Sequence, residues 1–378
     1  MGQRRLVGAP LLLATEFRCS SEVVSEFNDP YSSGLSERLG LRYDLSLLFG
    51  RGTRESEVPT VTGVSERRKP ARRPTRDEPV PLNFVMAPSF HSSTLLALLL
   101  NNHPDISCLG DTLPHRRLFP NQRCGCLQRV RDCPFWQEVS RGLDADRFLE
   151  SDHMIPAYPQ VVKNWRVNPY LARGLAASSL ALGPWVWNVA PRASREFLDT
   201  FLRFSEIVCE LQGTRIFVNN VKSFTSLLSL RSLLVDRAEI RILHLIRDPR
   251  GYHFSEKKSY PDITPAVSAR HWRDYHSRVE WLRRYTVPDG YLRVRYEDLC
   301  ADGEGTMAKI CSFLGAEPHP VCGPVAFPEK NHVLGNTSRL AFDGTIRQSL
   351  AWQGVLSVED EETLLSATRP LSEMCGYG

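Results

Sequence analysis

A short apolar run that ends in an arginine constrains the fold of this chain more than any other segment. The run covers residues 242–246, and Arg247, Asp248 and Pro249 follow it. Such a run is typical of a strand buried in a parallel sheet, and the proline ends it because proline lacks a backbone N–H. Arg247 is therefore expected at the carboxyl end of a strand, where open α/β sheets bind ligands. Ser255 comes eight residues later. A cation and a hydroxyl so placed suit a phosphate-like anion, and an arginine that pairs with Asp248 or a neighbouring acid is the alternative.

Strand-like and helix-like segments alternate along most of the chain. This alternation predicts an α/β fold, a three-layer sandwich with a central parallel sheet flanked by helices. Residues 112–210 lack a regular pattern and are predicted to be helical and rich in loops. The expected strands are 83–87, 105–109, 215–219, 240–246 and 291–295, and the expected helices are 92–101, 267–284 and 303–314.

The first eighty residues differ in composition from the rest. Residues 65–76 are charged, contain prolines and lack aromatic side chains. This composition is typical of a solvated linker, although a targeting signal or a contact with an acidic surface would look similar. We predict a weakly ordered basic extension over residues 1–80 and one domain over residues 81–378.

Composition also narrows the location and the partners of the chain. The net charge of +4 over 378 residues is too modest to indicate a nucleic-acid partner. Because the chain has no apolar run of 18 or more residues, no integral membrane segment is expected. The short apolar stretch at residues 7–14 contains a proline and is a poor signal peptide, so a cytoplasmic location is weakly favoured.

A second anion-binding signal follows the first expected strand. Phe90 and His91 precede three hydroxyl residues, Ser92, Ser93 and Thr94, at the expected start of a helix. A helix start offers free backbone N–H groups and the positive end of the helix dipole. The P-loop motif GxxxxGK[ST] does not occur in the chain. The segment is therefore either an anion cradle without the P-loop lysine or an ordinary capped helix.

In this order, the motifs resemble those of sulfotransferases that use 3′-phosphoadenosine 5′-phosphosulfate (PAPS). Residues 90–94 match the loop that holds the 5′-phosphosulfate in that family, and Arg247 with Ser255 matches the pair that holds the 3′-phosphate. The passages Arg295-Tyr296-Glu297-Asp298-Leu299 and Phe313-Leu314-Gly315 look like the family's usual sequence in this region. The resemblance covers residues 81–378 and implies a P-loop-like sulfotransferase fold with PAPS as co-substrate and no metal.

The resemblance also implies roles for two residues outside these motifs. Counting without a gap from Phe90 places Asp111 at the position of a catalytic glutamate, and Lys222 has the spacing of a catalytic lysine. Asp111 would accept the proton of an attacking hydroxyl, and Lys222 would stabilise charge on the leaving oxygen. A turn or cap aspartate and a solvent-facing lysine are the alternatives. In the carboxyl-terminal region, Asn336 and Arg339 are candidate contacts of the 3′-phosphate and adenine, unless they belong to a plain surface loop.

The chain departs from the family pattern at several positions. Phe90 stands where the family has Arg or Lys, and Ser92 stands where it has Gly. His91 could replace the lost cation if it were protonated. Asn220 stands where tyrosylprotein members have the disulfide partner of a cysteine that matches Cys108, so this chain is not expected to be a standard tyrosine sulfotransferase.

Three cysteines lie close together in the sequence. Cys124, Cys126 and Cys133 could bind zinc with a fourth ligand such as His115 or Cys108. Their spacing is not that of a standard zinc finger, and a disulfide or a small structural loop explains them at least as well.

The sequence thus predicts transfer of a sulfuryl group from PAPS to a hydroxyl or amine. The acceptor would be a small molecule, a carbohydrate or a peptide, and residues 112–210 are a natural place for its binding site. Two other functions stay open. A non-catalytic relative that binds PAPS or its desulfated product fits the changes at Phe90 and Ser92. A nucleotide kinase on a P-loop scaffold is less well supported because the P-loop lysine is missing.

Overall fold

The computed structural model describes residues 80–110, 122–143, 192–221, 238–283, 286 and 289–378. Asp111, His115 and Lys222 lie outside these ranges. The predicted extension of residues 1–80 also lies outside them, apart from Val80, where the first strand begins. That extension stays a prediction.

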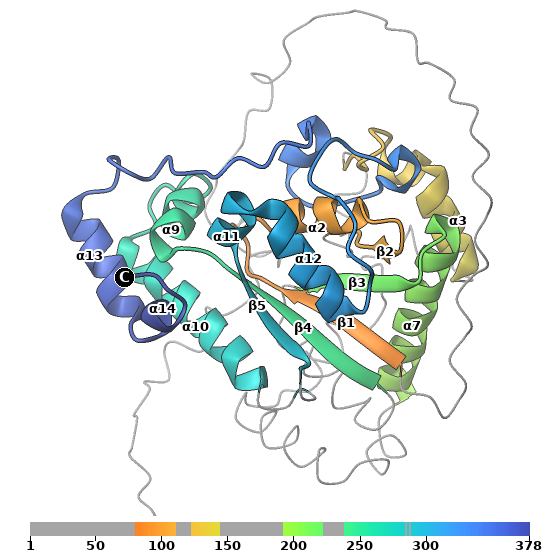
Figure 1. Cartoon of the computed structure of the whole chain (residues 1–378), viewed down its shortest axis with the longest axis horizontal. Coiled ribbons are helices and arrows are strands. Elements are labelled where there is room, and N and C mark those ends of the chain that lie inside the picture. The colour runs from red at the N-terminus through yellow and green to blue at the C-terminus, as the bar shows by residue number, and fades with distance from the viewer. Residues whose placement is uncertain (1–79, 111–121, 144–191, 222–237, 284–285, 287–288) are drawn as a thin grey trace, which may run out of the picture. The chain divides into compact units, whose positions relative to one another are not determined.

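Five parallel strands form the central sheet, in the order β2-β3-β1-β4-β5 (Figure 1). The prediction of a parallel α/β sheet is confirmed, and each strand falls within a few residues of its expected place. Because β1 lies at the centre, the chain crosses over between neighbouring strands, as parallel pairing requires. The strands are β1 (Val80–Met86), β2 (Ile106–Ser107), β3 (Ile216–Val221), β4 (Ala238–Ile246) and β5 (Tyr291–Arg295).

One face of the sheet packs on helices α2 (Ser93–Asn101) and α12 (Gly303–Leu314). Val85 and Leu243 share a buried apolar cluster with leucines of α2 and with Met307 and Ile310 of α12. Adjacent side chains on a strand point to opposite faces, so the neighbours of Val85 and Leu243 must be covered from the other side.

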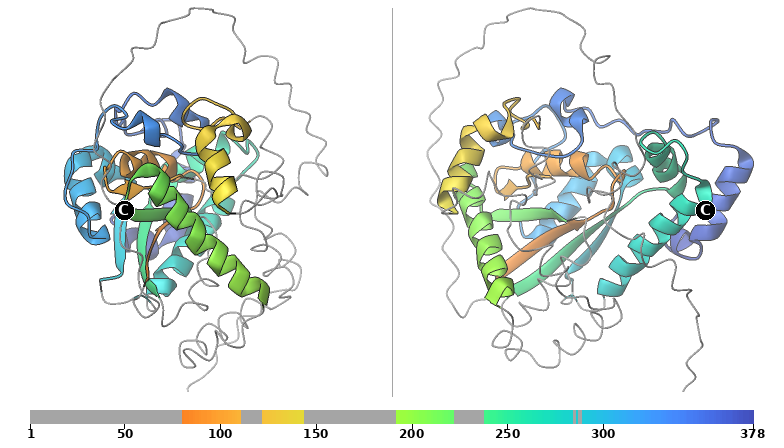
Figure 2. Two further views of the ribbon diagram at one scale, coloured as in Figure 1. Left: turned by 90° about the vertical axis from the view of Figure 1, so that its right-hand side faces the viewer. Right: turned by 180° about the vertical axis from the view of Figure 1, so that it is seen from behind.

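Helices α7 (Arg192–Gln212) and α10 (Pro265–Arg283) cover that other face. Phe84 of β1 stacks on Phe201 of α7 with ring centroids 6.1 Å apart. Together the views show helices in front of and behind the sheet (Figures 1 and 2). The three layers predicted from the sequence are therefore present, and both faces of the central strands are buried, as their continuous apolar runs require.

Helix ends fix the backbone next to the carboxyl ends of the strands. Helix α9 (Pro249–Lys257) begins with proline at its first position, and its N-cap Asp248 accepts a 2.8 Å hydrogen bond from the Arg250 N–H. This cap leaves Arg247 as the residue between strand β4 and the helix cap. Its place at the end of a strand is the one predicted.

The carboxyl-terminal segment returns to the end of β2. The Leu334 N–H donates a 2.8 Å hydrogen bond to the Leu109 carbonyl, and Gly110 forms a parallel bridge with Leu334. Helix α13 (Val358–Thr368) then packs against α10. The remaining elements are η3 (Val130–Asp132), α3 (Pro134–Gly142), α11 (Tyr296–Ala301), η4 (Pro328–Lys330), η5 (Thr337–Ala341) and α14 (Leu371–Met374). Within the described ranges, none of the helices combines the length and the apolar character needed to cross a bilayer.

We predict that Gly110→Ala destabilises the protein much more than Gly213→Ala does. Both glycines have a left-handed backbone, with φ of +70° and +65°. A Cβ at Gly110 would lie 2.1 Å from the Leu334 carbonyl oxygen, whereas a Cβ at Gly213 would meet nothing within 4 Å. Gly213→Ala should therefore cost about 1–2 kcal/mol for the backbone alone, and Gly110→Ala about 3 kcal/mol or more. Urea unfolding measures both, and equal losses would show that the chain does not approach Gly110 this closely.

Candidate functional site

The carboxyl ends of three strands meet at one edge of the sheet. In the register of the sheet, Met86 of β1 lies beside Val221 of β3 and His244 of β4. The loop over residues 87–92 and Arg247 therefore emerge at the same edge. Lys222 follows Val221 in the sequence and lies outside the described residues.

The loop between β1 and α2 holds two residues in the left-handed backbone region. Phe90 has φ 68° and Ser92 has φ 61°, although neither is glycine. Each such residue costs about 1–2 kcal/mol, and strain of this kind is found mainly at functional sites. Ser92 is the N-cap of α2, and its side chain makes no capping hydrogen bond. The first N–H groups of the helix are thus left for another acceptor, which is how helix starts and backbone nests bind anions.

Arg247 is buried, with 4% of its surface exposed, and reaches across to this loop. Its Nη1 donates to the Phe90 carbonyl at 2.9 Å and to the Ser255 hydroxyl at 3.1 Å. Its Nη2 is also buried and has no hydrogen-bond partner among the residues described. A buried guanidinium N–H without an acceptor is costly, so an anion is the natural ligand of this atom.

Asp248 does not serve as the acid partner of Arg247. It makes a bidentate ion pair with Arg250 instead, with distances of 2.7 and 3.0 Å. The guanidinium of Arg247 rests on the ring of Tyr296, 4.7 Å from its centroid. The geometry thus opposes the alternative that Arg247 is only half of a salt bridge with Asp248.

The Phe90 side chain packs against aromatic rings of the protein. Its ring packs against Tyr252 and Tyr260, with centroids 6.3 and 6.2 Å away. A residue at this position that turns its side chain to the protein interior still leaves its backbone in the loop, where its carbonyl binds Arg247. Sequence reasoning treated Phe90 as a lost cation and did not foresee this structural role of its ring and carbonyl.

A chain of three buried histidines runs behind the loop. His91 Nε2 lies 2.8 Å from His276 Nε2, and His276 Nδ1 lies 2.7 Å from His244 Nε2. All three rings are fully buried. The far end of the chain is His244 Nδ1, 2.5 Å from the Tyr291 hydroxyl, which donates to Glu280 at 2.5 Å.

Proton counting gives this chain a direction. At the near end of the chain, His91 Nδ1 faces the Ser89 carbonyl at 3.1 Å. The chain therefore consists of five contacts, and a group that can only accept a hydrogen bond stands at each end: the Ser89 carbonyl and the Glu280 carboxylate. Neutral rings and the tyrosine supply four protons for these five contacts. The short contacts are all satisfied when every group donates toward Glu280, whose pKa is lowered to about 2: burial acts to raise it, and hydrogen bonds from His244, Tyr291 and Arg293 outweigh that effect. The longest contact, at Ser89, is then the one without a proton.

The surroundings of His91 oppose the protonated state in which it could replace the missing cation. The pKa of His91 is lowered to about 3, mainly by burial and also by the nearby charge of Arg247, against the effect of the Ser89 carbonyl. A ring that is neutral near pH 7 cannot replace the cation that the loop lacks. His91 instead ties the strained loop to helix α10 through His276.

The two candidate residues of the carboxyl-terminal region differ in what they contact. Asn336 donates its backbone N–H to the Thr94 hydroxyl at 3.2 Å, so this segment does reach the loop and helix start. The guanidinium of Arg339 donates to the carbonyls of Val333, Gly335, Asn336 and Arg123. With these acceptors, Arg339 holds the carboxyl-terminal segment together, and its contact with the nucleotide stays a prediction.

Comparison with known proteins identifies the family. The model of the sulfotransferase family matches residues 92–320, which is more than half of the chain. The chain belongs to the sulfotransferase family. Sulfotransferase 2A6 of Rattus norvegicus is 24% identical over 194 residues, covering 45% of this chain and 62% of that protein. Sulfotransferase 2A1 of Macaca fascicularis is 22% identical over 272 residues, covering 65% and 82%.

A solved sulfotransferase domain also aligns with this chain. The sulfotransferase domain of the Synechococcus PCC 7002 olefin synthase is 21% identical, with a TM-score of 0.48 over 82% of this chain and 99% of that domain. The chain spans less than two thirds of the length of the rat sulfotransferases 2A6 and 2A1.

One residue of this sulfotransferase stands out although the sequence did not single it out for a role. Asn220 is buried near the carboxyl end of β3, and both polar atoms of its side chain are without a hydrogen-bond partner among the described residues. Sequence reasoning noted Asn220 only as the missing partner of a disulfide with Cys108. A buried polar side chain two residues before Lys222 is a further candidate for contact with a ligand, and the signal was its polarity within an apolar strand.

We predict that Ser92→Gly stabilises the protein. Glycine adopts the φ of 61° at Ser92 without a Cβ penalty, so the free energy of unfolding should rise by about 1 kcal/mol. Ser93→Gly is the matched control, because Ser93 is the first residue of the helix and is not among the residues with positive φ, so glycine there relieves no strain and should bring no gain in stability. Chemical unfolding measures both changes. A loss of stability in both variants would contradict a strained Ser92.

We predict that acid destabilises the protein through the histidine chain. Burial is the main cause that lowers the pKa of His91, His244 and His276 below 6.5, their value in the unfolded chain. Between about pH 3 and 6.5 the unfolded chain therefore binds more protons than the folded one, so stability is complete above pH 6.5 and falls as the pH drops. His276→Gln should flatten this dependence by about 1.4 kcal/mol per pH unit between about pH 4 and 5.5. Urea unfolding at several pH values tests this, and an unchanged slope would contradict it.

Proposed function

We propose that this chain transfers a sulfuryl group from PAPS to a hydroxyl or amine acceptor. The observation that carries the proposal is the buried Nη2 of Arg247, which lacks an acceptor beside a hydroxyl and a strained helix start. Membership of the sulfotransferase family supports PAPS as the donor. The family model covers residues 92–320, which include the start of α2 as well as Arg247 and Ser255. Positioning and charge stabilisation would supply most of the acceleration, by analogy with phosphoryl transfer.

Two groups of residues would bind the two anionic ends of PAPS, the 3′-phosphate and the 5′-phosphosulfate. Arg247 and Ser255 would bind the 3′-phosphate, because Nη1 already holds the Ser255 hydroxyl in place and Nη2 is left for the phosphate. Ser92, Ser93 and Thr94 would hold the 5′-phosphosulfate with the N–H groups at the start of α2. Asn336, whose backbone reaches Thr94, would close the carboxyl-terminal segment over this second group.

Asp111 and Lys222 would carry the chemical step. Asp111 would accept the proton of the acceptor hydroxyl while the oxygen of that hydroxyl forms a bond to the sulfur of PAPS. The bond between sulfur and the bridging oxygen of the phosphate would break, and Lys222 would stabilise the charge that develops there. Support comes from the chain positions, since Val221, before Lys222, ends β3, and Gly110, before Asp111, lies three residues beyond the neighbouring strand β2. With a neutral His91 and an inward Phe90, Lys222 is the remaining cation proposed for this charge.

A non-catalytic nucleotide-binding relative is the second candidate. Phe90 and Ser92 favour it, because the loop lacks the cation found there in the family. A nucleotide kinase gains no support from the family match. The acceptor would be a small molecule, a carbohydrate or a peptide.

We predict that Ser255→Ala and Arg247→Lys weaken binding of adenosine 3′,5′-bisphosphate. Loss of one charge-assisted contact should cost about tenfold in Kd for Ser255→Ala, and Arg247→Lys should cost more because it also removes the tether to Phe90. Ser259→Ala is the matched control, since Ser259 is exposed just beyond the same helix. Titration calorimetry measures the three affinities. Equal affinities in all three variants would place the nucleotide elsewhere.

Turnover separates the two candidate functions. The full chain is incubated with labelled PAPS and a panel of hydroxyl and amine acceptors, and sulfated products are detected by mass spectrometry. Sulfation that Asp111→Asn abolishes, with nucleotide affinity unchanged, is the expected result. Full turnover in Asp111→Asn would exclude the aspartate as base. Tight nucleotide binding by the unmodified chain, with no transfer to any acceptor, would favour the non-catalytic function.

A further inference from the structure

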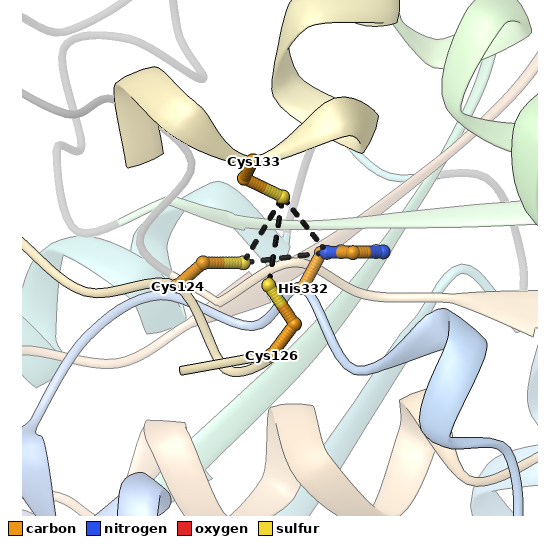
Figure 3. A group of neighbouring side chains, drawn as sticks. All are labelled: Cys124, Cys126, Cys133 and His332. Atoms are coloured by element: carbon orange, nitrogen blue, oxygen red, sulfur yellow. Dashed lines mark hydrogen bonds between the residues drawn. The ribbon is translucent and has the colours of Figure 1, made fainter. Parts of the chain in front are cut away.

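Three cysteines and one histidine from distant parts of the chain converge on one point (Figure 3). Cys124, Cys126 and Cys133 come from the segment that contains η3 and the start of α3, and His332 follows η4 near the carboxyl end. The three sulfur atoms and the imidazole nitrogen all lie within 4.8 Å of one another. Cys126 is half-buried and the other three residues are buried.

Four of the six separations between these atoms are close to the edges of a tetrahedron around a zinc ion. Zn–S distances of about 2.3 Å and Zn–N distances of about 2.0–2.1 Å require S···S edges of about 3.8 Å and S···N edges of about 3.6 Å. Cys133 Sγ lies 3.9 Å from Cys124 Sγ and 3.5 Å from Cys126 Sγ. The Nδ1 atom of His332 lies 3.3 Å from Cys124 Sγ and 3.5 Å from Cys133 Sγ.

The other nitrogen of His332 is already fixed. Its Nε2 lies 3.0 Å from the Glu329 carbonyl, which can only accept, so Nε2 carries the proton. In the neutral ring, Nδ1 then carries the lone pair, and Figure 3 shows the contacts of His332 with Cys124 and Cys133. A histidine that ligates a metal with one nitrogen and donates from the other to a carbonyl is the usual arrangement in metal sites. Phe135 stacks on the ring at 4.1 Å and holds its plane.

The backbone around the cysteines is shaped to bring them together. A tight turn places the Cys124 N–H 2.8 Å from the Gln128 carbonyl, with Leu127 in a left-handed conformation. A Cβ on Gly125 would lie 2.5 Å from the Asn331 side chain, so only glycine allows this turn to approach the residue before His332. Asn331 closes the contact by donating to the Gly125 carbonyl at 3.1 Å.

The surrounding charges suit a cluster of thiolates. Cys133 is the N-cap of helix α3, where the positive end of the helix dipole stabilises negative charge. The buried guanidinium of Arg339 donates to the carbonyl of Arg123, next in sequence to Cys124. Three thiolates, a neutral imidazole and Zn²⁺ would carry a net charge of −1, which this helix end and this arginine can balance.

We propose that Cys124, Cys126, Cys133 and His332 bind one structural zinc ion. Four protein ligands fill a tetrahedral site and leave no position for substrate, so the ion stabilises the fold and takes no part in sulfuryl transfer. Cys108, suggested from the sequence as the fourth ligand, belongs to the separate apolar cluster around α2. His332 takes that place, and the site does not depend on the proposed function.

The zinc ion would fix a segment that touches the nucleotide edge. Just beyond His332, Leu334 pairs with Leu109, and Asn336 donates to Thr94. Because a metal site joins residues 124–133 to residue 332, its loss should release this segment from the helix start. Only this consequence rests on the proposed function.

Metal analysis of the purified full chain tests the site directly. We expect one zinc per chain by inductively coupled plasma mass spectrometry, and Co²⁺ exchanged into the site should show the absorption bands of a tetrahedral thiolate complex. His332→Cys should keep the metal, and Cys133→Ser and His332→Phe should lose most of it. Cys322→Ser is the matched control, because this half-buried cysteine lies outside the cluster.

Metal uptake by the unmodified chain can be measured even where a variant fails to fold. A folded chain that takes up neither Zn²⁺ nor Co²⁺ would overturn the proposal. A disulfide between Cys126 and Cys133 in the folded protein, detected by peptide mapping, would also overturn it. Zinc retained in His332→Phe would overturn the ligand set. Chelation of the zinc should raise the Kd for adenosine 3′,5′-bisphosphate several-fold; a site that binds zinc without this effect would refute the link to the nucleotide edge and leave the ligand set intact.

Discussion

The buried guanidinium of Arg247 is the contact on which this edge of the sheet depends. It extends from the end of β4 to the carbonyl of Phe90, in the loop that follows β1. Two left-handed residues strain that loop by about 1–2 kcal/mol each. A hydrogen bond from a charged donor contributes about 1.5–3 kcal/mol, so Arg247 offsets much of this strain. The same side chain orients Ser255 and presents its unpaired Nη2, which joins the stability of the loop to the binding of an anion.

Polar groups buried on the α10 face of the sheet support the loop from behind. The histidine chain links the loop at His91 to Glu280 through hydrogen bonds in which each neutral ring donates once. Such a chain is stable only when nearly all of its contacts are satisfied, since unpaired buried polar groups are costly. It therefore specifies one position for the loop, at the price of sensitivity to acid. A second anchor, the cysteine and histidine cluster, holds the carboxyl-terminal segment against the other side of the same edge.

Much of the fold could be predicted because its signals are local. Apolar runs marked each of the five strands, and Gly315 marked the end of α12, where it forms the left-handed C-cap. Arg247 and Ser255 were found because strand, turn and helix lie within a short stretch of sequence. The strained backbone at Ser92 was indicated by the glycine that the family has there. Whether His91 can carry charge was left open, because burial decides the charge of a histidine and no local pattern reveals burial.

By itself, the sequence determined the order of strands and helices along the chain, the parallel sheet and the residues at its carboxyl edge. These follow from the periodicity of apolar side chains and from proline and glycine, which act within a few residues. The tertiary structure decided which side chains meet. It alone brought His332 to Cys133, 199 residues away, and gave Arg247 an acceptor 157 residues away in Phe90. Contacts of this range depend on how the layers pack and where a backbone can approach closely, as at Gly125, and these are properties of the assembled fold.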